Sequence, residues 1–77
     1  MHDVKKLEKF IETSGKKNSF LADKLGLTYQ GFIYKVRGRS EFLYSEVEIL
    51  AKELGMNVKE KKQIFLNRNV NYIPHKK

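Results

Sequence analysis

Side chains that can bind nucleic acid gather between residues 17 and 40 of the chain. The amide of Gln30 can donate and accept hydrogen bonds together, which matches N6 and N7 of adenine, and Tyr29 and Tyr34 can contact a thymine methyl group or a phosphate. The same segment carries polar and cationic side chains that can bind phosphate oxygens: Lys17, Asn18, Thr28, Lys35, Arg37, Arg39 and Ser40. Each of these residues also has an ordinary structural role, as a helix cap, a solvated side chain or a packing residue.

The charge of the 77-residue chain is polarised, with a net value of +7. Residues 16–39 contain six bases against a single acid, Asp23, whereas residues 40–60 contain five acids against two bases. A basic stretch attracts phosphate backbones without reading sequence, although it can also serve as a solvated surface. The charge pattern therefore favours nucleic acid as a partner.

Other kinds of chemistry lack the residues that they need. The chain has no cysteine, and His2 and His75 stand at opposite ends, so we expect neither a metal centre nor a histidine-based triad. No nucleophile–base pair and no glycine-rich phosphate loop is present, so we expect no enzymatic activity and no cofactor, and no site for a small-molecule effector is evident. No run of about 18 apolar residues could span a membrane, and the start lacks the apolar region of a secretory signal. We expect a cytoplasmic protein.

The spacing of apolar residues and of helix-capping residues predicts five short helices. The first begins after Asp3 as its cap and ends at Gly15. The second takes Asn18 or Ser19 as its cap and ends at Gly26. No segment alternates in the manner of a strand, so the chain is expected to form an all-α domain.

The fourth and fifth helices are each expected to open with a capping box. Ser45 with Glu48 forms the first of these boxes, and Asn57 with Glu60 forms the second. Before the fourth helix, Phe42 interrupts a polar loop. We expect its ring to plug the core; the alternative is an exposed anchor for a partner.

A sharp turn at Gly26 is expected to join the second helix to the third. Such a turn needs a positive φ, which glycine reaches without a Cβ clash. Ala22, one helical turn earlier, lets the next helix pack closely, and Thr28 caps that helix, which runs to about Arg37 and stops at Gly38. A short helix, a glycine turn and a capped second helix are the signature of a helix-turn-helix.

These residues also carry a family resemblance. The stretch "LADKLGLTYQGFIYKVRGRSEF", followed by "SEVEILAKELGM", resembles the Cro/C1-type (XRE-like) helix-turn-helix domains of phage repressors and bacterial regulators. Within that family it is most similar to small phage-encoded Cro-like proteins of Gram-positive bacteria. The resemblance covers residues 4–66 and implies a five-helix lambda-repressor-like domain that regulates transcription as a homodimer on a palindromic operator. A bacterial cytoplasm and a prophage origin would be in keeping with it.

The third helix, Thr28–Arg37, is then expected to enter the major groove. Phe32 and Val36 share its core face, which leaves three residues to meet base edges: Tyr29, Gln30 and Tyr34. The resemblance places a polar phosphate ligand at Asn18. The loop after the helix puts further phosphate contacts beside the groove wall: Arg37, Arg39 and Ser40.

Two positions of the third helix are unusual. Gly31 has no side chain, which permits close approach to DNA or, as we expect, close packing on the second helix. The family usually has an apolar residue or tryptophan where this chain has Lys35, and Val36 follows here. Either the helix is slightly rotated, or Lys35 passes its aliphatic stem beside the core.

The end of the chain is the expected dimer contact. Residues 1–67 are predicted to form the DNA-binding domain, and residues 68–77 a tail that either joins the dimer contact, folds back or is disordered. The apolar residues expected at that contact are Phe65, Leu66, Tyr72 and Ile73. A rival interpretation is a protein-binding adaptor, such as an antirepressor or antitoxin-like module, on the same scaffold. An RNA-binding module is disfavoured because no aromatic strand platform is predicted.

Overall fold

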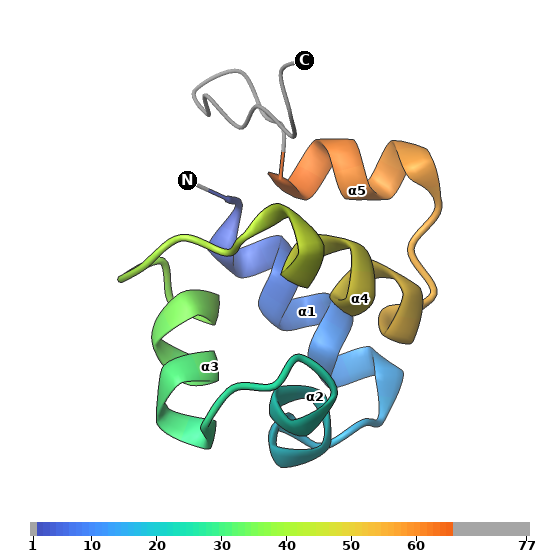
Figure 1. Cartoon of the computed structure of the whole chain (residues 1–77). Coiled ribbons are helices and arrows are strands. Elements are labelled where there is room, and N and C mark those ends of the chain that lie inside the picture. Colours follow the sequence, from blue (N-terminus) through green and yellow to red (C-terminus); the bar gives the residue numbers. More distant parts are fainter. Residues whose placement is uncertain (1, 66–77) are drawn as a thin grey trace.

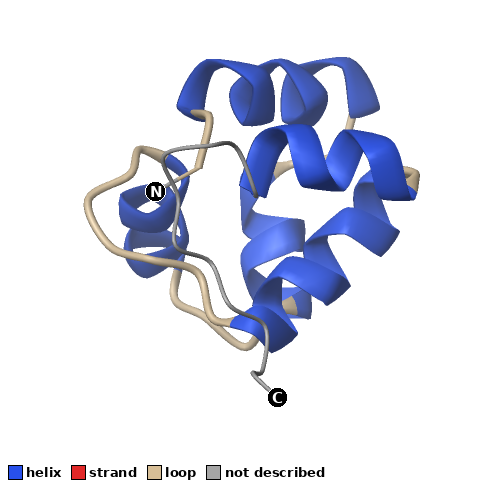
Figure 2. Ribbon diagram, turned by 90° about the horizontal axis from the view of Figure 1, so that it is seen from above, coloured by secondary structure: helices blue, strands red, loops and turns tan. Residues whose placement is uncertain are grey.

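Five α-helices make up the described part of the protein. The computed structural model describes residues 2–65, and this part consists only of helices and loops (Figures 1 and 2). The helices are α1 (Val4–Ser14), α2 (Asn18–Lys24), α3 (Tyr29–Val36), α4 (Tyr44–Leu54) and α5 (Val58–Phe65). The predicted all-α fold with five helices is confirmed. None of these helices combines the length and the apolar character that crossing a bilayer requires.

The predicted caps of α1 and α5 form as expected. The Asp3 carboxylate accepts a hydrogen bond from the backbone N–H of Lys6 at 3.1 Å, which caps α1. At α5, the Glu60 N–H donates to Asn57 Oδ1 at 2.7 Å, and the Asn57 N–H donates to Glu60 Oε1 at 2.9 Å. Both caps pair residues three apart, so the local sequence is sufficient to specify them.

The predicted starts of α2 and α4 are wrong. Lys17 is the N-cap of α2, because its carbonyl already accepts the first helical bond from Leu21 N–H; Asn18 is therefore the first helical residue. In α4 the N-cap is Leu43, and its N–H donates to Glu46 Oε1 at 2.9 Å. Glu46, rather than Glu48, thus supplies the carboxylate that satisfies a free amide at this end.

Glycine turns end α2 and α3 in the same way. Gly26 has φ of 72°, and Leu27 N–H donates back to Ala22 O at 2.9 Å. Gly38 has φ of 81°, and Arg39 N–H donates back to Tyr34 O at 2.9 Å. These backbone bonds satisfy carbonyls that the helix end would otherwise leave unpaired. The predicted glycine turns at both positions are confirmed.

The core lies where α1 meets the helices around it. α1 packs on α3, α4 and α5, and α2 packs on α3 and α4 (Figure 1). The largest fully buried side chains are Leu7, Leu21, Phe32, Val47, Leu50 and Ile64. Phe42 is also buried, and its ring centroid lies 6.4 Å from that of Phe32. The prediction that Phe42 plugs the core is confirmed.

Candidate nucleic-acid interface

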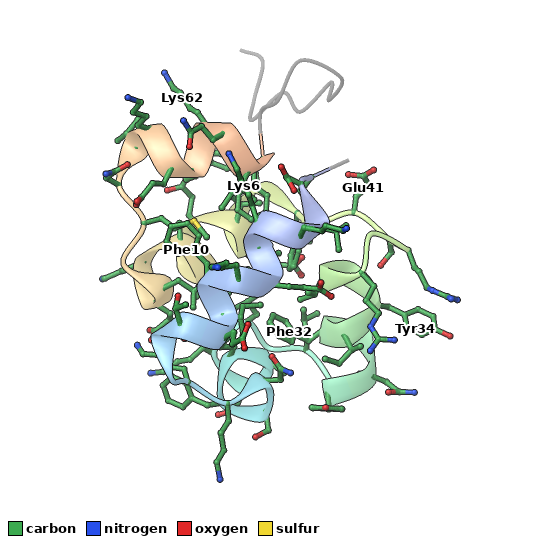
Figure 3. All side chains as sticks on the ribbon, turned by 180° about the vertical axis from the view of Figure 1, so that it is seen from behind. Lys6, Phe10, Phe32, Tyr34, Glu41 and Lys62 are labelled. Carbon is green, nitrogen blue, oxygen red and sulfur yellow. The ribbon has the colours of Figure 1, made fainter. Side chains whose placement is uncertain are left out.

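α3 has a buried face and an exposed face. Phe32 and Val36, four residues apart, are buried in the core, as predicted. The side chains predicted to read bases lie on the other face: Tyr29 is 54% exposed, Tyr34 is 51% exposed, and Gln30 is exposed. Figure 3 shows Phe32 pointing inward and Tyr34 pointing away from the domain. The exposed face therefore offers one amide and two phenol groups to a partner.

The first turn of α3 is held by a single side-chain cap. Thr28 Oγ1 accepts a hydrogen bond from Gly31 N–H at 3.0 Å. A Cβ atom at Gly31 would lie 3.0 Å from the same oxygen and would meet no atom of α2 within 4 Å. The expected packing of Gly31 on the second helix is therefore wrong, and the glycine instead leaves room for the cap. The Thr28 side chain is exposed, and its hydroxyl proton can still be donated to a phosphate.

Exposed cations precede α2 and follow α3 along the chain. Lys17 precedes α2, and Arg37 and Arg39 follow α3 with Ser40 beside them. Within residues 2–65, no carboxylate forms an ion pair with Lys17, Arg37 or Arg39. The Arg39 guanidinium lies 5.7 Å from the centroid of the Tyr34 ring, so the loop and the exposed face of α3 touch. These bases are available to an anionic partner.

Several lysines are instead paired with acids between helices. Lys16 Nζ lies 3.3 Å from Glu53 Oε1 and links the end of α1 to α4. Lys61 Nζ lies 2.7 Å from Glu48 Oε2 and links α5 to α4. These ion pairs lower the positive charge around α4 and α5. The positive charges of Lys17, Arg37 and Arg39 are not offset by any ion pair within residues 2–65.

Lys35 belongs to the paired group. Its ammonium lies 2.6 Å from Glu46 Oε1, and its side chain is only 16% exposed. Phe32 and Val36, on either side of it along the helix, lie on the core face. The aliphatic stem of Lys35 passes beside the core, which was one of the two explanations offered for this position. Its ammonium group, however, contacts a carboxylate of α4 instead of solvent. The structure does not present Lys35 with the exposed bases predicted to bind phosphate.

An open groove of about 660 Å³ brings together residues from three segments. Lys17 and the half-buried Asn18 lie at the start of α2, and Tyr29 and Arg37 come from α3 and the residue after it. The wall contributed by α1 carries Glu8 and Glu12. The carboxylates of these acids lower the positive potential that Lys17 and Arg37 give to the groove.

The prediction that Phe65 forms part of a dimer contact is wrong, because this side chain is buried in the core. This side chain is 3% exposed, and its ring centroid lies 5.9 Å from that of Phe42. It is therefore a core residue and offers no surface to a second copy. The other predicted contacts, Leu66, Tyr72 and Ile73, lie outside the described residues.

A residue that the sequence did not identify closes this aromatic cluster. His2 is buried, with ring centroids 5.3 Å from Phe42 and 5.7 Å from Phe65. Its Nε2 lies 2.8 Å from the carbonyl oxygen of Val36, in the last turn of α3, and donates a hydrogen bond to it. No periodicity or cap marks a residue this close to the start of the chain, so no sequence signal could have revealed the contact.

No family model matches the chain, and neither the curated proteins nor the solved structures compared with it include a match. In the described part of the chain, no three histidine, cysteine or acidic side chains are grouped so that they could hold a metal ion. Function must therefore be inferred from the arrangement of the chain's own residues.

Proposed function

We propose that the protein is a sequence-specific DNA-binding transcriptional regulator of the lambda-repressor-like helix-turn-helix class. One observation carries the proposal: α3 exposes Gln30 between two exposed tyrosines, and the exposed bases Lys17, Arg37 and Arg39, which pair with no carboxylate of residues 2–65, lie near this helix. The glycine turn at Gly26 and the Thr28 cap, which join α2 to α3, support the same class. α3 would enter the major groove of duplex DNA with its first turn leading.

Base recognition is assigned to the exposed face of α3. Gln30 would bind adenine through N6 and N7, a contact that discriminates against other bases by about 1–3 kcal/mol. Tyr29 and Tyr34 would contact thymine methyl groups or the adjoining backbone. None of these side chains has to leave the core to do so, because all three are already exposed.

Phosphate contacts would fix the protein on the duplex. With α3 in the major groove, the DNA backbone would be contacted by Lys17 and Arg37, which line the groove between α1 and α3, and by Arg39 and Ser40 in the loop after α3. Asn18 and the Thr28 hydroxyl are further candidates. Because cations that neutralise phosphates release counterions, the affinity should fall steeply as salt increases.

A homodimer is part of the proposal. One domain of this size reads few base pairs, and two copies with half-sites about 34 Å apart would read enough for tight binding. Sedimentation of the full chain and of a version lacking residues 68–77 tests whether the tail supports the dimer. We expect truncation to reduce the dimer fraction and to abolish cooperative binding to paired half-sites.

Selection of bound sequences from random duplex DNA is the direct test of function. We expect an enriched palindromic motif, with binding to it weakening strongly between two salt concentrations in gel-shift titrations. Equal and weak binding to every duplex would contradict the proposal. It would leave a non-specific basic protein and would favour the adaptor interpretation.

A further inference from the structure

We propose that Lys35 and Glu46 are positioning residues whose buried ion pair fixes the loop that binds the DNA backbone. The loop comprises residues 37–43 and carries Arg37, Arg39 and Ser40. The inference rests on the proposed function. It assigns to Lys35 an indirect role through Glu46, in place of direct contact with a phosphate.

The geometry joins three parts of the chain at one atom. Glu46 Oε1 accepts a hydrogen bond from Lys35 Nζ at 2.6 Å and another from Leu43 N–H at 2.9 Å. Lys35 lies in α3, Leu43 ends the loop, and Glu46 lies in α4. A single carboxylate oxygen thus ties the last turn of α3 to the far end of the loop.

Burial makes this pair different from the other ion pairs. The Glu46 side chain is 9% exposed and that of Lys35 is 16% exposed, whereas Glu48 and Lys16 in the other pairs are about 40% exposed. Each charge also suits its helix end, since Lys35 lies in the last turn of α3 and Glu46 in the first turn of α4. Removing one partner leaves the other charge buried without compensation, which forces a local rearrangement.

The loop is held at both of its ends, and its exposed bases lie between them. Its start is set by the Gly38 turn and by the bond from Arg39 N–H to Tyr34 O. Its end is set by Glu46 and by the buried ring of Phe42. A binding side chain must be held within about 0.5 Å of its productive position, so a shift at the loop end would weaken the backbone contacts.

The sign of the effect separates positioning from simple charge. If charge alone mattered, Glu46→Gln would remove an anion and tighten DNA binding, while Lys35→Met would remove a cation and weaken it. If the pair positions the loop, both substitutions weaken binding. Glutamine keeps a carbonyl oxygen that can still accept from Leu43 N–H, so Glu46→Gln tests the ion pair and not the cap.

The experiment compares four full-length proteins on the selected duplex at fixed salt: the unsubstituted chain, Lys35→Met, Glu46→Gln and the double variant. We expect each single substitution to lower the affinity by roughly tenfold, as for the loss of one charge-assisted contact. The double variant should bind more tightly than Glu46→Gln alone, although it carries one positive charge fewer, because no buried charge is left uncompensated.

Matched controls measure charge alone. Lys62→Met removes an exposed cation of α5, at the end of the domain away from α3, and should change the affinity little (Figure 3). Glu12→Gln removes an exposed acid from the groove wall and should tighten binding slightly. Circular dichroism at the assay temperature establishes that every variant is folded.

Either of two outcomes would overturn this inference alone. One is a folded Glu46→Gln variant that binds the duplex as tightly as the unsubstituted chain. The other is a loss of DNA affinity from Lys35→Met that is equal in the unsubstituted chain and in the Glu46→Gln variant. The second result would make Lys35 a direct phosphate ligand. Failure of the unsubstituted chain to bind any duplex selectively would overturn the proposed function as well, and the outcomes are therefore distinguishable.

Discussion

The two ends of α3 are built differently. In the first turn, Tyr29 and Gln30 are exposed, and the only side-chain bond described there is the Thr28 cap. In the last turn, the Val36 carbonyl accepts a bond from His2 and Lys35 pairs with Glu46, while Phe42 closes the core beyond it. The helix is thus held to the domain at its last turn and presents its first turn to solvent.

This difference suits a helix that reads another molecule. Side chains used to hold the helix cannot also contact a partner. The last turn therefore exposes only Tyr34 among the three proposed base contacts, whereas the first turn exposes Tyr29 and Gln30. Contacts at the held end should therefore affect the free energy of unfolding, and contacts at the exposed end should affect binding. Each substitution below tests whether that separation holds.

The largest expected effect comes from Phe42→Ala at the held end. Truncation leaves a cavity among Phe32, His2 and Phe65, and a Phe→Ala change in a core costs about 3–5 kcal/mol of unfolding free energy. Urea unfolding followed by circular dichroism measures it. The exposed Tyr29→Ala, in the first turn of α3, is the control and should cost at most about 0.5 kcal/mol. Equal losses from the two would mean that the ends are not separated.

Gln30→Ala at the exposed end should leave unfolding unchanged and weaken binding. We expect a loss of about 1–3 kcal/mol on the best duplex and a relaxed preference at one base pair. Titration against a panel of single mismatches measures both quantities. A uniform loss across the panel would show that Gln30 does not read a base and that the proposed orientation of α3 is incorrect.

Arg39→Ala tests the loop that follows the last turn of α3. The Arg39 side chain is exposed and forms no ion pair with an acid of residues 2–65. Its removal should therefore weaken binding to all duplexes alike, by about 1.5 kcal/mol. The slope of log affinity against log salt should flatten by about one. Lys62→Ala changes the net charge equally and should leave the slope near its original value. If the slope changed equally in both variants, Arg39 would contribute only to the overall charge of the protein and would not contact a phosphate directly.

His2→Phe gives the smallest expected effect. Phenylalanine keeps a ring beside Phe42 and Phe65 but cannot donate a hydrogen bond to the Val36 carbonyl. The free energy of unfolding should therefore fall by about 1 kcal/mol. The midpoint of thermal unfolding measures the change. An unaltered midpoint, with the ring still buried, would show that this hydrogen bond adds nothing to the hold on α3.

The sequence alone determined those features whose partners are close along the chain. The turns at Gly26 and Gly38, and the cap of α3 at Thr28, depend on residues no more than five apart. The burial of Phe32 and Val36 follows from helical spacing in the same way. The exposed positions of Gln30 and both tyrosines then follow because they lie on the remaining face of α3.

Only the tertiary structure decided which long-range partners hold that helix in place. The Lys35–Glu46 pair spans 11 residues and the His2–Val36 bond spans 34, and Phe65 joins the core instead of a surface patch. Glu46, which takes the place predicted for Glu48 at the start of α4, also accepts a hydrogen bond from a lysine of another helix, and only the packing of α3 on α4 brings that lysine to it. Such choices depend on the relative positions of whole helices, which packing sets and no local pattern encodes.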